Sequence, residues 1–447
     1  MSDLIDAVTR WQAQQQPYRL LWDYYRGRHQ LRFASRDFAS KQAAKLLTDT
    51  VMSIRENLCP AAVSAFTDGI SVAHWGAADT DDATQAAGLS RLESMVSRAA
   101  FAYGDAFAVV TDTDEGPQAT FVRPESMVPT VDPIHPDRLE RAARVWIDPT
   151  NHGRCNVWYA DRLERWRTVQ PVRISATDAA TVPDTDDGWT SMDNEQGGDV
   201  IRHSHGVVPV CWWKRDPDDQ WSHGSSILAD VIPLQDAMNK ALADLIVTSE
   251  TYARPFYALL NHQGGGPVNP FAPQTKTAPT RIDPNSQQIW TTDGPGPFLR
   301  FDPPDLTPLL RVQDAFAAKV ARVVGAPSYY FSQTSGDVPS GESLRILSTR
   351  RTATIRAWQR DAEPVWRGLL ELLGIEPGVR WDDPMPLDPV ERVQIAQAKQ
   401  AMGWPLVDIA RELGEPDPED LAARAAAAQA GQAVEMGRRL MRGDVGY

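Results

Sequence analysis

The feature that most constrains the fold is a pair of amphipathic segments separated by a long stretch rich in glycine and proline. In residues 225–250, apolar side chains recur at steps of three and four, which predicts one long helix with an apolar face. The same spacing predicts a second helix over 305–325. The stretch 252–304 is too long for a simple connection, so we interpret it as a small module with short strands. The predicted apolar face of the second helix consists of Leu309, Val312, Phe316, Val320 and Val323.

The longest periodic run in the chain follows over residues 341–374. Its apolar spacing predicts a helix of about nine turns at 3.6 residues each. Arg351 interrupts the apolar stripe, and Pro364 predicts a kink after Glu363. The arginines on the other faces indicate a solvated surface, with subunit contacts as the alternative. The stripe consists of Leu344, Leu347, Ile355, Trp358, Ala362, Val365, Leu369 and Leu372.

Residues 336–343, GDVPSGES, differ by one residue from the phosphate-binding pattern G-x-x-x-x-G-K-[ST]. Glu342 stands where that pattern needs a lysine, and the preceding SYYFSQTS is not a buried apolar strand, so an ATPase is not expected. The sequence instead predicts a flexible loop that runs into the long helix, with Ser340 as N-cap and Glu342 favourably placed at the helix dipole.

The remaining patterns predict an α+β fold. Residues 1–75 have helical spacing, and the stretch 176–199 is acidic and turn-rich, which predicts an exposed loop. Short β-branched and aromatic runs predict an antiparallel sheet. A further strand and turn are predicted near 379–388, followed by two short helices. The tail from Leu421 is helical by propensity. The sheet runs are 101–110, 121–133, 143–148, 156–160 and 165–172, and the short helices are 389–404 and 405–414.

Charge and cysteine content exclude several classes of protein. With 59 acidic and 45 basic residues among 447, the net charge of −14 excludes a protein that wraps nucleic acid on a basic surface. Cys59, Cys155 and Cys211 lie far apart, so they predict neither a disulfide framework nor a zinc knuckle and fit a reducing cytoplasm. The start of the chain has no signal-peptide pattern, and no stretch reaches the roughly 18 apolar residues of a membrane span.

No motif for catalysis or for cofactor binding is present. The sequence has no G-x-S-x-G elbow, H-E-x-x-H pair or dinucleotide fingerprint, so we expect no enzyme, no catalytic residue and no cofactor. His203, His205 and Cys211 alternate in a way that would suit three metal ligands on one side of a sheet. No fourth ligand follows at a convincing spacing, and histidines in a turn near Gly206 explain the same pattern.

The order of these elements resembles the portal proteins of tailed bacteriophages, which form the ring at the capsid vertex. The resemblance covers nearly the whole chain in order, although no single motif is specific. Its motifs are LWDYYRGRHQL, ENLCPAAVSAFTDGISV, AYGDAF, PESMVPTVDP, PLQDAMNKALADLI, SGESLRILSTRRTATIRAWQ and WDDPMPLDPVERVQIAQA.

The resemblance implies a division of the chain into the parts of a portal subunit. The expected parts are a wing over 1–224, a first stem helix over 225–251, a clip over 252–304, a second stem helix over 305–325, a tunnel loop over 326–340, the long kinked helix and closing strand of the wing over 341–387, and a helical crown with the C-terminal tail over 388–447. The expected tunnel-loop residues are Tyr329, Ser332, Gln333, Thr334, Ser335 and Asp337.

The resemblance also implies a function and partners. The expected function is a channel for DNA packaging and ejection that docks a terminase and a head-to-tail adaptor, within a homo-oligomeric ring of usually twelve subunits. A major capsid or scaffolding protein is a further expected partner, and the expected location is the virion after assembly in the host cytoplasm. The packaging ATPase is a separate terminase in this family, which fits the missing lysine in GDVPSGES.

Charge suggests how DNA would pass. Twelve copies of a chain with charge −14 carry roughly −168, so such a ring would repel DNA and let it slide. Arg311, Lys319 and Arg322 are the candidate channel-lining cations, and surface or intersubunit charges are an equal alternative for them. Two rival functions remain open: a head-assembly or adaptor protein without a channel, and a metal-dependent enzyme.

Overall fold

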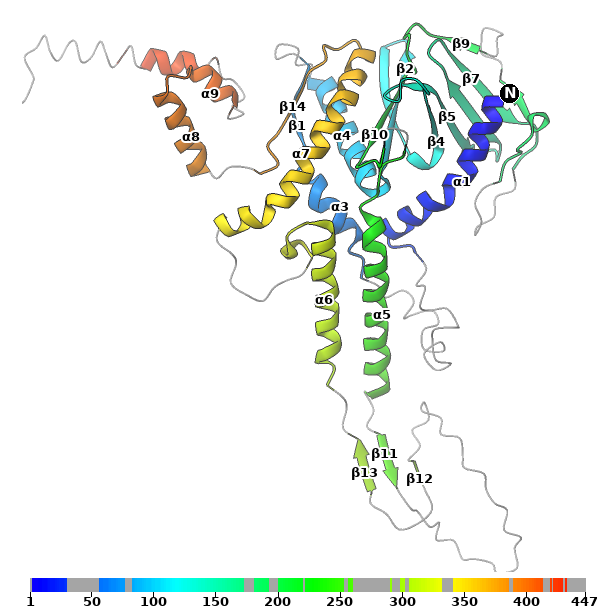
Figure 1. Cartoon of the computed structure of the whole chain (residues 1–447), viewed down its shortest axis with the longest axis vertical. Helices are drawn as coiled ribbons and strands as arrows, with labels where there is room; N and C mark the ends of the chain where they lie inside the picture. Colours follow the sequence, from blue (N-terminus) through cyan, green and yellow to red (C-terminus); the bar gives the residue numbers. More distant parts are fainter. Residues whose placement is uncertain are drawn as a thin grey trace, which may run out of the picture.

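The computed structural model contains a body of helices and sheets from which one helix pair projects (Figure 1). The pair consists of α5 (Leu228–Tyr252) and α6 (Thr307–Val324). Beyond its far end lie the strands β11 (Phe256–Leu259), β12 (Trp290–Thr291) and β13 (Phe298–Phe301). The mixed helix and sheet content agrees with the predicted α+β class. The structure describes residues 2–29, 56–76, 83–172, 181–192, 200–219, 222–252, 256–259, 290–291, 298–301, 305–331, 341–385, 389–412, 419, 421–428 and 431.

Two antiparallel sheets form much of the body. The smaller has the strand order β10–β2–β3, and the larger runs β4–β5–β6–β7–β8 with β9 paired to β7. The first six residues of β2 are all buried because this central strand is covered on both faces. The bounds are β2 Asp105–Thr113, β3 Gly116–Val122, β4 Met127–Val131, β5 Leu139–Ile147, β6 Gly153–Trp158, β7 Arg162–Thr168, β8 Trp189–Ser191, β9 Val200–Arg202 and β10 Val210–Lys214.

The largest core joins helices from both ends of the chain to the smaller sheet. Trp366 is fully buried, and the centroid of its ring lies 4.9 Å from that of Trp75 and 4.6 Å from that of Trp213. The ring of Phe101 lies 5.8 Å from that of Trp358 in an edge-to-face arrangement. The helices that contribute to this core are α1 (Ser2–Tyr25), α3 (Cys59–Thr67), α4 (Ala83–Tyr103), α5, α6 and α7 (Gly341–Leu372).

The N-terminal half of α1 packs on the larger sheet and forms a second core. Leu4, Val8 and Trp11 recur at helical spacing and are buried in the same cluster as Val145 and Val157 of β5 and β6. The guanidinium of Arg141 on β5 adds ion pairs to two carboxylates of the first turns of α1, at 3.5 Å from Asp3 and 3.0 Å from Asp6.

The base of α5 is attached to the smaller sheet through a close approach of two glycines. Gly104 has φ +92°, which ends α4, and a Cβ at this position would lie 2.2 Å from the carbonyl oxygen of Gly224. Next to it, the buried Asp105 carboxylate accepts hydrogen bonds from Tyr18 Oη at 2.6 Å and Trp212 Nε1 at 2.8 Å. The same carboxylate accepts one from the backbone N–H of Gly224 at 3.0 Å. These contacts fix where the projecting helix begins.

Several predicted elements are present with close bounds. The helix predicted over 225–250 is α5, and α7 is unbroken from Gly341 to Leu372 although it contains Pro364. The predicted strand near 379–388 is β14 (Val379–Trp381), which pairs with β1 (Val72–Trp75). The two short C-terminal helices are α8 (Pro389–Ala401) and α9 (Leu406–Glu412).

Three local predictions are wrong. Phe101–Tyr103 continue α4 instead of starting a strand, because the turn comes only at Gly104. Residues 72–75 form β1 within the region expected to be helical, since β14 supplies a partner from the far end of the chain. The acidic stretch expected to be an exposed loop includes β8, and Trp189 is buried under α1 in the second core. The part of the helical prediction that falls on 30–55 lies outside the described residues.

The described helices contain none that is both long and apolar enough to span a membrane.

The buried residue Glu93 on α4 provides a test of how burial affects stability. The residue is 5% exposed, and burial raises the pKa of its carboxyl group to about 7 although Ser97 donates a hydrogen bond to it. A carboxyl group whose pKa is higher in the folded than in the unfolded state lowers the free energy of unfolding once it ionises. For Glu93 this loss develops as the pH rises from the ordinary pKa of a glutamate to the folded-state pKa near 7. We expect Glu93→Gln to raise the free energy of unfolding by on the order of 3 kcal/mol at pH 8 and by much less at pH 5.

Chemical denaturation at both pH values measures this difference. Glu115→Gln at the exposed turn between β2 and β3 is the control and should leave the difference near zero. An equal effect of Glu93→Gln at pH 5 and pH 8 would contradict the interpretation.

Candidate functional site

The projecting helix pair is the most distinctive structural feature, and small residues are among those that its helices bury. α5 and α6 lie side by side along their length (Figure 1). On α6 the buried residues are Ala317, Val320 and Ala321, and on α5 they include Ala241 and Ala243. Alanines are thus among the residues that each helix buries.

The apolar face predicted for α6 is therefore only partly correct. Val320 is fully buried and Phe316 is half-buried against the core, as expected. In contrast, Val312 is 39% exposed and Val323 is 42% exposed. Leu310 beside them is 50% exposed. A short helix pair thus carries large apolar side chains that its own subunit leaves in solvent.

The three candidate cations all lie on α6 and are exposed. In the described part of the chain, Arg311, Lys319 and Arg322 make no ion pair within 4 Å. The Lys319 ammonium lies 4.8 Å from the centroid of the Phe316 ring, which is a cation–π distance. The helix therefore presents three positive charges that no described residue pairs with in an ion pair.

Only the first part of the predicted tunnel loop lies within the described residues. α6 ends at Gly325, whose φ of +77° gives a left-handed cap, and a Cβ there would come 2.6 Å from Nε of Arg350. Ala326 and Phe331 are buried and hold a 3₁₀ turn, η5 (Ser328–Tyr330), between them. Of the candidate loop residues, Ser332, Gln333, Thr334, Ser335 and Asp337 lie outside the described residues, as does the predicted N-cap Ser340.

Tyr329 is the one candidate loop residue that the structure describes. It is 42% exposed, and its ring stacks on that of Tyr330 with centroids 4.8 Å apart. Its hydroxyl oxygen lies 3.4 Å from Oγ of Ser348 on α7. This contact attaches the base of the loop, which follows α6, to the long helix α7.

Arg351, the residue that interrupts the apolar stripe of α7, is buried because it caps another helix. The last four carbonyl groups of α3 have no hydrogen-bond donor within the helix. Those of Ser64, Phe66 and Thr67 accept hydrogen bonds from backbone N–H groups of the residues that follow α3. The fourth, Ala65 O, accepts a hydrogen bond from Nε of Arg351. The guanidinium also lies 5.7 Å from the centroid of the Tyr330 ring, so a single side chain joins α3, α7 and the loop base.

The apolar stripe of α7 is buried in its C-terminal part only. Ile355, Trp358, Ala362 and Leu369 are buried as predicted. Trp366, which lies outside the predicted stripe, is also fully buried. In contrast, Ile346 is 69% exposed and Leu347 is 54% exposed, since the first turns of α7 extend past the body. The sequence pattern gave no sign of where the body would stop covering the stripe.

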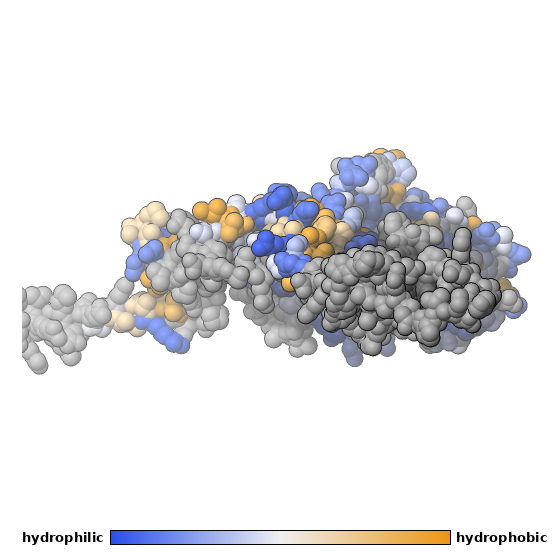
Figure 2. All heavy atoms as spheres, turned by 90° about the horizontal axis from the view of Figure 1, so that it is seen from below, coloured by the Kyte–Doolittle hydropathy of each residue, from blue (hydrophilic) through white to orange (hydrophobic). Residues whose placement is uncertain are grey.

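Figure 2 shows the molecule from the lower end of Figure 1, along the helix pair. Orange hydrophobic and blue hydrophilic residues alternate over the coloured part of this face. On α6 and α7 the exposed large apolar residues include Leu310, Val312 and Leu347.

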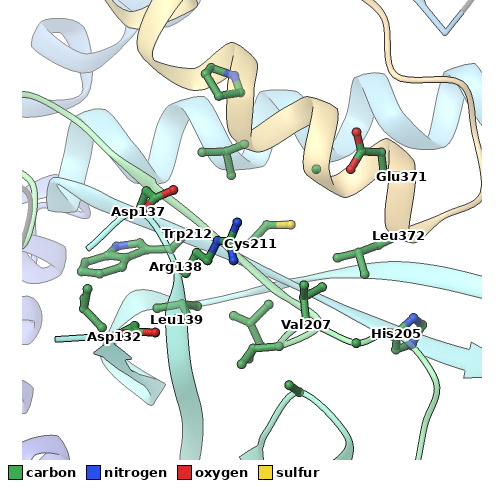
Figure 3. Close-up of a pocket in the computed structure, with 18 of the residues that line it drawn as sticks. Asp132, Asp137, Arg138, Leu139, His205, Val207, Cys211, Trp212, Glu371 and Leu372 are labelled. Atoms are coloured by element: carbon green, nitrogen blue, oxygen red, sulfur yellow. The ribbon is translucent and has the colours of Figure 1, made fainter. Parts of the chain in front are cut away.

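A large cavity between β10 and the C-terminal half of α7 is the place where an enzyme site would be sought (Figure 3). Its volume is about 1020 Å³, and Cys211, Arg138 and Glu371 are among the residues that line it. Burial raises the pKa of the Cys211 thiol to about 12, so the thiolate needed for nucleophilic attack is absent at neutral pH. The cavity therefore lacks an activated nucleophile at its only cysteine.

The proposed metal ligands do not come together. Within the described ranges, no group of three His, Cys, Asp or Glu side chains could hold a metal ion. His205 instead pairs with Asp112, with Nε2 3.2 Å from a carboxylate oxygen, while its ring centroid lies 5.0 Å from that of His203. The alternative in which His203, His205 and Cys211 are metal ligands therefore finds no support among the described residues.

A family model matches part of the chain. Residues 68–286 match the family described as phage portal protein, SPP1 Gp6-like. The match supports the resemblance to portal proteins that the sequence predicted, and the matched family is structural and not enzymatic. It therefore favours a capsid portal role over the enzyme alternative.

Solved structures show a weaker likeness. The chain resembles one in "Neck of native GTA particle computed with C12 symmetry", with 14% identity, a TM-score of 0.45, and coverage of 85% of this chain and 94% of that chain. It also resembles one in "Neck of empty GTA particle computed with C6 symmetry", with 14% identity, a TM-score of 0.44 and the same coverage. No curated protein matches the chain.

Removal of Arg351 tests whether this side chain fixes the loop base. Arg351→Ala leaves Ala65 O without its donor in a buried place, which we expect to lower the free energy of unfolding by about 2 kcal/mol. The midpoint of thermal unfolding should fall accordingly. Arg360→Ala, at an exposed position of the same helix, is the matched control and should change the midpoint little. Equal midpoints for the two variants would show that the cap contributes nothing.

Proposed function

We propose that the chain is the subunit of a closed ring at a capsid vertex, and that double-stranded DNA passes through this ring during packaging and ejection. The observation that carries the proposal is the helix pair, which projects from the body with Leu310, Val312 and Val323 exposed on α6. Neighbouring copies around a closed ring would cover such side chains, because cyclic symmetry places the same surfaces together in every subunit.

The first turns of α7 support the same assembly. Ile346 and Leu347 lie beside a run of arginines and are among the most exposed apolar residues of the described chain. Exposed apolar side chains at the base of the pair would make the contact between subunits continuous from α6 to α7. A ring of twelve such subunits is the assembly that portal resemblance favours.

In this proposal the elements take the parts of a portal subunit. α5 and α6 are the stem, in segments 225–251 and 305–325, and β11 to β13 belong to the clip over 252–304. The wing comprises residues 1–224 together with the long helix and closing strand over 341–387. The tunnel loop is 326–340, and α8 and α9 belong to the crown and tail over 388–447.

The charge distribution supports a conduit that lets DNA slide. The subunit is acidic overall, and its free cations on α6 would become rings of positive charge under cyclic symmetry. We assign Arg311, Lys319 and Arg322 to the channel wall, where they would contact phosphates transiently. The clip would present the docking surface for the terminase and later for the head-to-tail adaptor. The wing would face the major capsid or scaffolding protein in the virion, after assembly in the host cytoplasm.

Electron microscopy of variants tests the ring. The double change Ile346→Glu and Leu347→Glu places charges at positions that are exposed in the single subunit, so folding should be preserved. In a ring the same charges would be buried at subunit contacts, and we expect subunits or open fragments where the unchanged protein gives rings with an axial hole. Class averages and mass photometry measure the outcome.

Ile134→Glu, on the hairpin between β4 and β5, is the matched control because Ile134 is 80% exposed and lies outside α6 and the first turns of α7. This variant should form rings. Discrete single subunits from the unchanged protein under assembly conditions would overturn the proposed function.

Deletion of Ser332–Asp337 tests the proposed tunnel loop. Because the deletion spares α6 and α7, rings should form normally, whereas DNA packaging or retention in particles should be impaired. The measurement is the fraction of particles with a full genome. Normal yields of full particles from the deletion variant would remove the role assigned to the loop.

A further inference from the structure

A small pocket outside the helix pair combines apolar walls with a basic rim. It has a volume of about 330 Å³ and lies between the end of α1, the C-terminal half of α4 and β3. Trp22, Tyr25 and Phe121 are half-buried around it, and Met95 is 36% exposed at its edge. The Trp22 ring is stacked with those of Tyr25 and Tyr103, at centroid distances of 5.7 Å and 6.0 Å.

Guanidinium groups are held over this aromatic wall. The Cζ atoms of Arg26 and Arg123 each lie 4.5 Å from the centroid of the Trp22 ring, and Arg98 lines the pocket. Stacking fixes a guanidinium while leaving its N–H edge free to bind a carboxylate. The rim is therefore pre-organised for anions before any ligand arrives.

Few acidic groups neutralise the rim. Glu125 pairs with Arg123 at 3.1 Å and accepts a hydrogen bond from Tyr103 Oη at 3.3 Å. In the part of the chain that the structure describes, neither Arg26 nor Arg98 has an ion pair within 4 Å. This local excess of positive charge occurs in a chain whose net charge is −14. The combination selects a ligand with both an apolar group and negative charge.

We infer that this pocket, the Trp22 pocket, docks an acidic peptide segment of a partner protein that inserts one bulky apolar side chain. The volume suits one or two side chains, and a buried apolar anchor surrounded by complementary charge is how short segments gain affinity and specificity. Duplex DNA fits the rim less well, because its outer phosphates offer no apolar group for the pocket.

The segment that follows α1 in this chain is not the expected occupant. Residues 30–55 contain five Lys or Arg residues and two Asp residues, so their charge has the same sign as the rim. The Trp22 pocket also lies on elements other than α6 and α7. The inference consequently does not depend on ring formation.

An array of twelve-residue peptides tests the inference on the full-length protein. Each peptide carries one central Leu, Met, Phe or Trp in a Glu-rich background, and matched sets carry a central Ser or a Lys-rich background. We expect acidic peptides with an apolar centre to bind, the Ser-centred set to bind at least tenfold more weakly, and the Lys-rich set not to bind. Fluorescence anisotropy of the best peptide gives its affinity.

Charge reversal locates the binding site. Arg98→Glu should weaken binding of that peptide by about tenfold or more, because it places a like charge at the rim. Arg91→Glu is the matched control on the same exposed side of α4 outside the Trp22 pocket, and should stay within about twofold. Circular dichroism shows whether both variants are folded.

Four outcomes would overturn the inference, and the first three concern the peptides and the variants. They are the failure of every acidic peptide to bind at millimolar concentration, equal binding of Ser-centred peptides, and equal losses in the Arg98→Glu and Arg91→Glu variants. Competition by a short duplex DNA, but not by free glutamate, would assign the site to nucleic acid instead and would also overturn it.

Discussion

The burial of Trp366 between Trp75 and Trp213 is the interaction on which the rest of the structure depends. It holds the C-terminal half of α7 against β10 and the β1–β14 pair, so the late part of the chain closes the core begun by the early part. Because α7 is fixed there, its first turns extend past the body and carry Arg351 to the end of α3. The loop base, whose Ala326 and Phe331 are buried in the main core, gains a further connection to it through this buried guanidinium.

A second constraint determines how the helix pair leaves the body. The backbones at Gly104 and Gly224 approach so closely that no side chain fits between them, and the Asp105 carboxylate gathers donors from α1, β10 and the segment before α5. A buried carboxylate with several donors is costly to disrupt, which makes the start of α5 rigid. Forces applied along a projecting helix pair would thus be transmitted to the body rather than absorbed by a hinge.

The sequence predicted the helices and strands better than it predicted which of their side chains are buried. The long helices, β14 and the two short C-terminal helices follow from local periodicity, which needs no tertiary information. Trp189 and Trp366 were missed because their burial depends on α1 and on β1, which are distant in the chain. The apolar face of α6 was misplaced towards Val312 and Val323, since the alanines among its buried residues carry little hydrophobic signal.

The sequence by itself determined the resemblance to portal proteins, the absence of a catalytic motif and the order of the helices, because these depend on residue types and spacing along the chain. Only the tertiary structure decided that Arg351 caps α3 and that His205 pairs with Asp112. It also decided that two arginines lie over the ring of Trp22 while a third lines the Trp22 pocket. Each of these contacts joins residues remote in sequence, and a one-dimensional pattern holds no record of which distant backbone atom or ring will lie within a few ångströms of a given side chain.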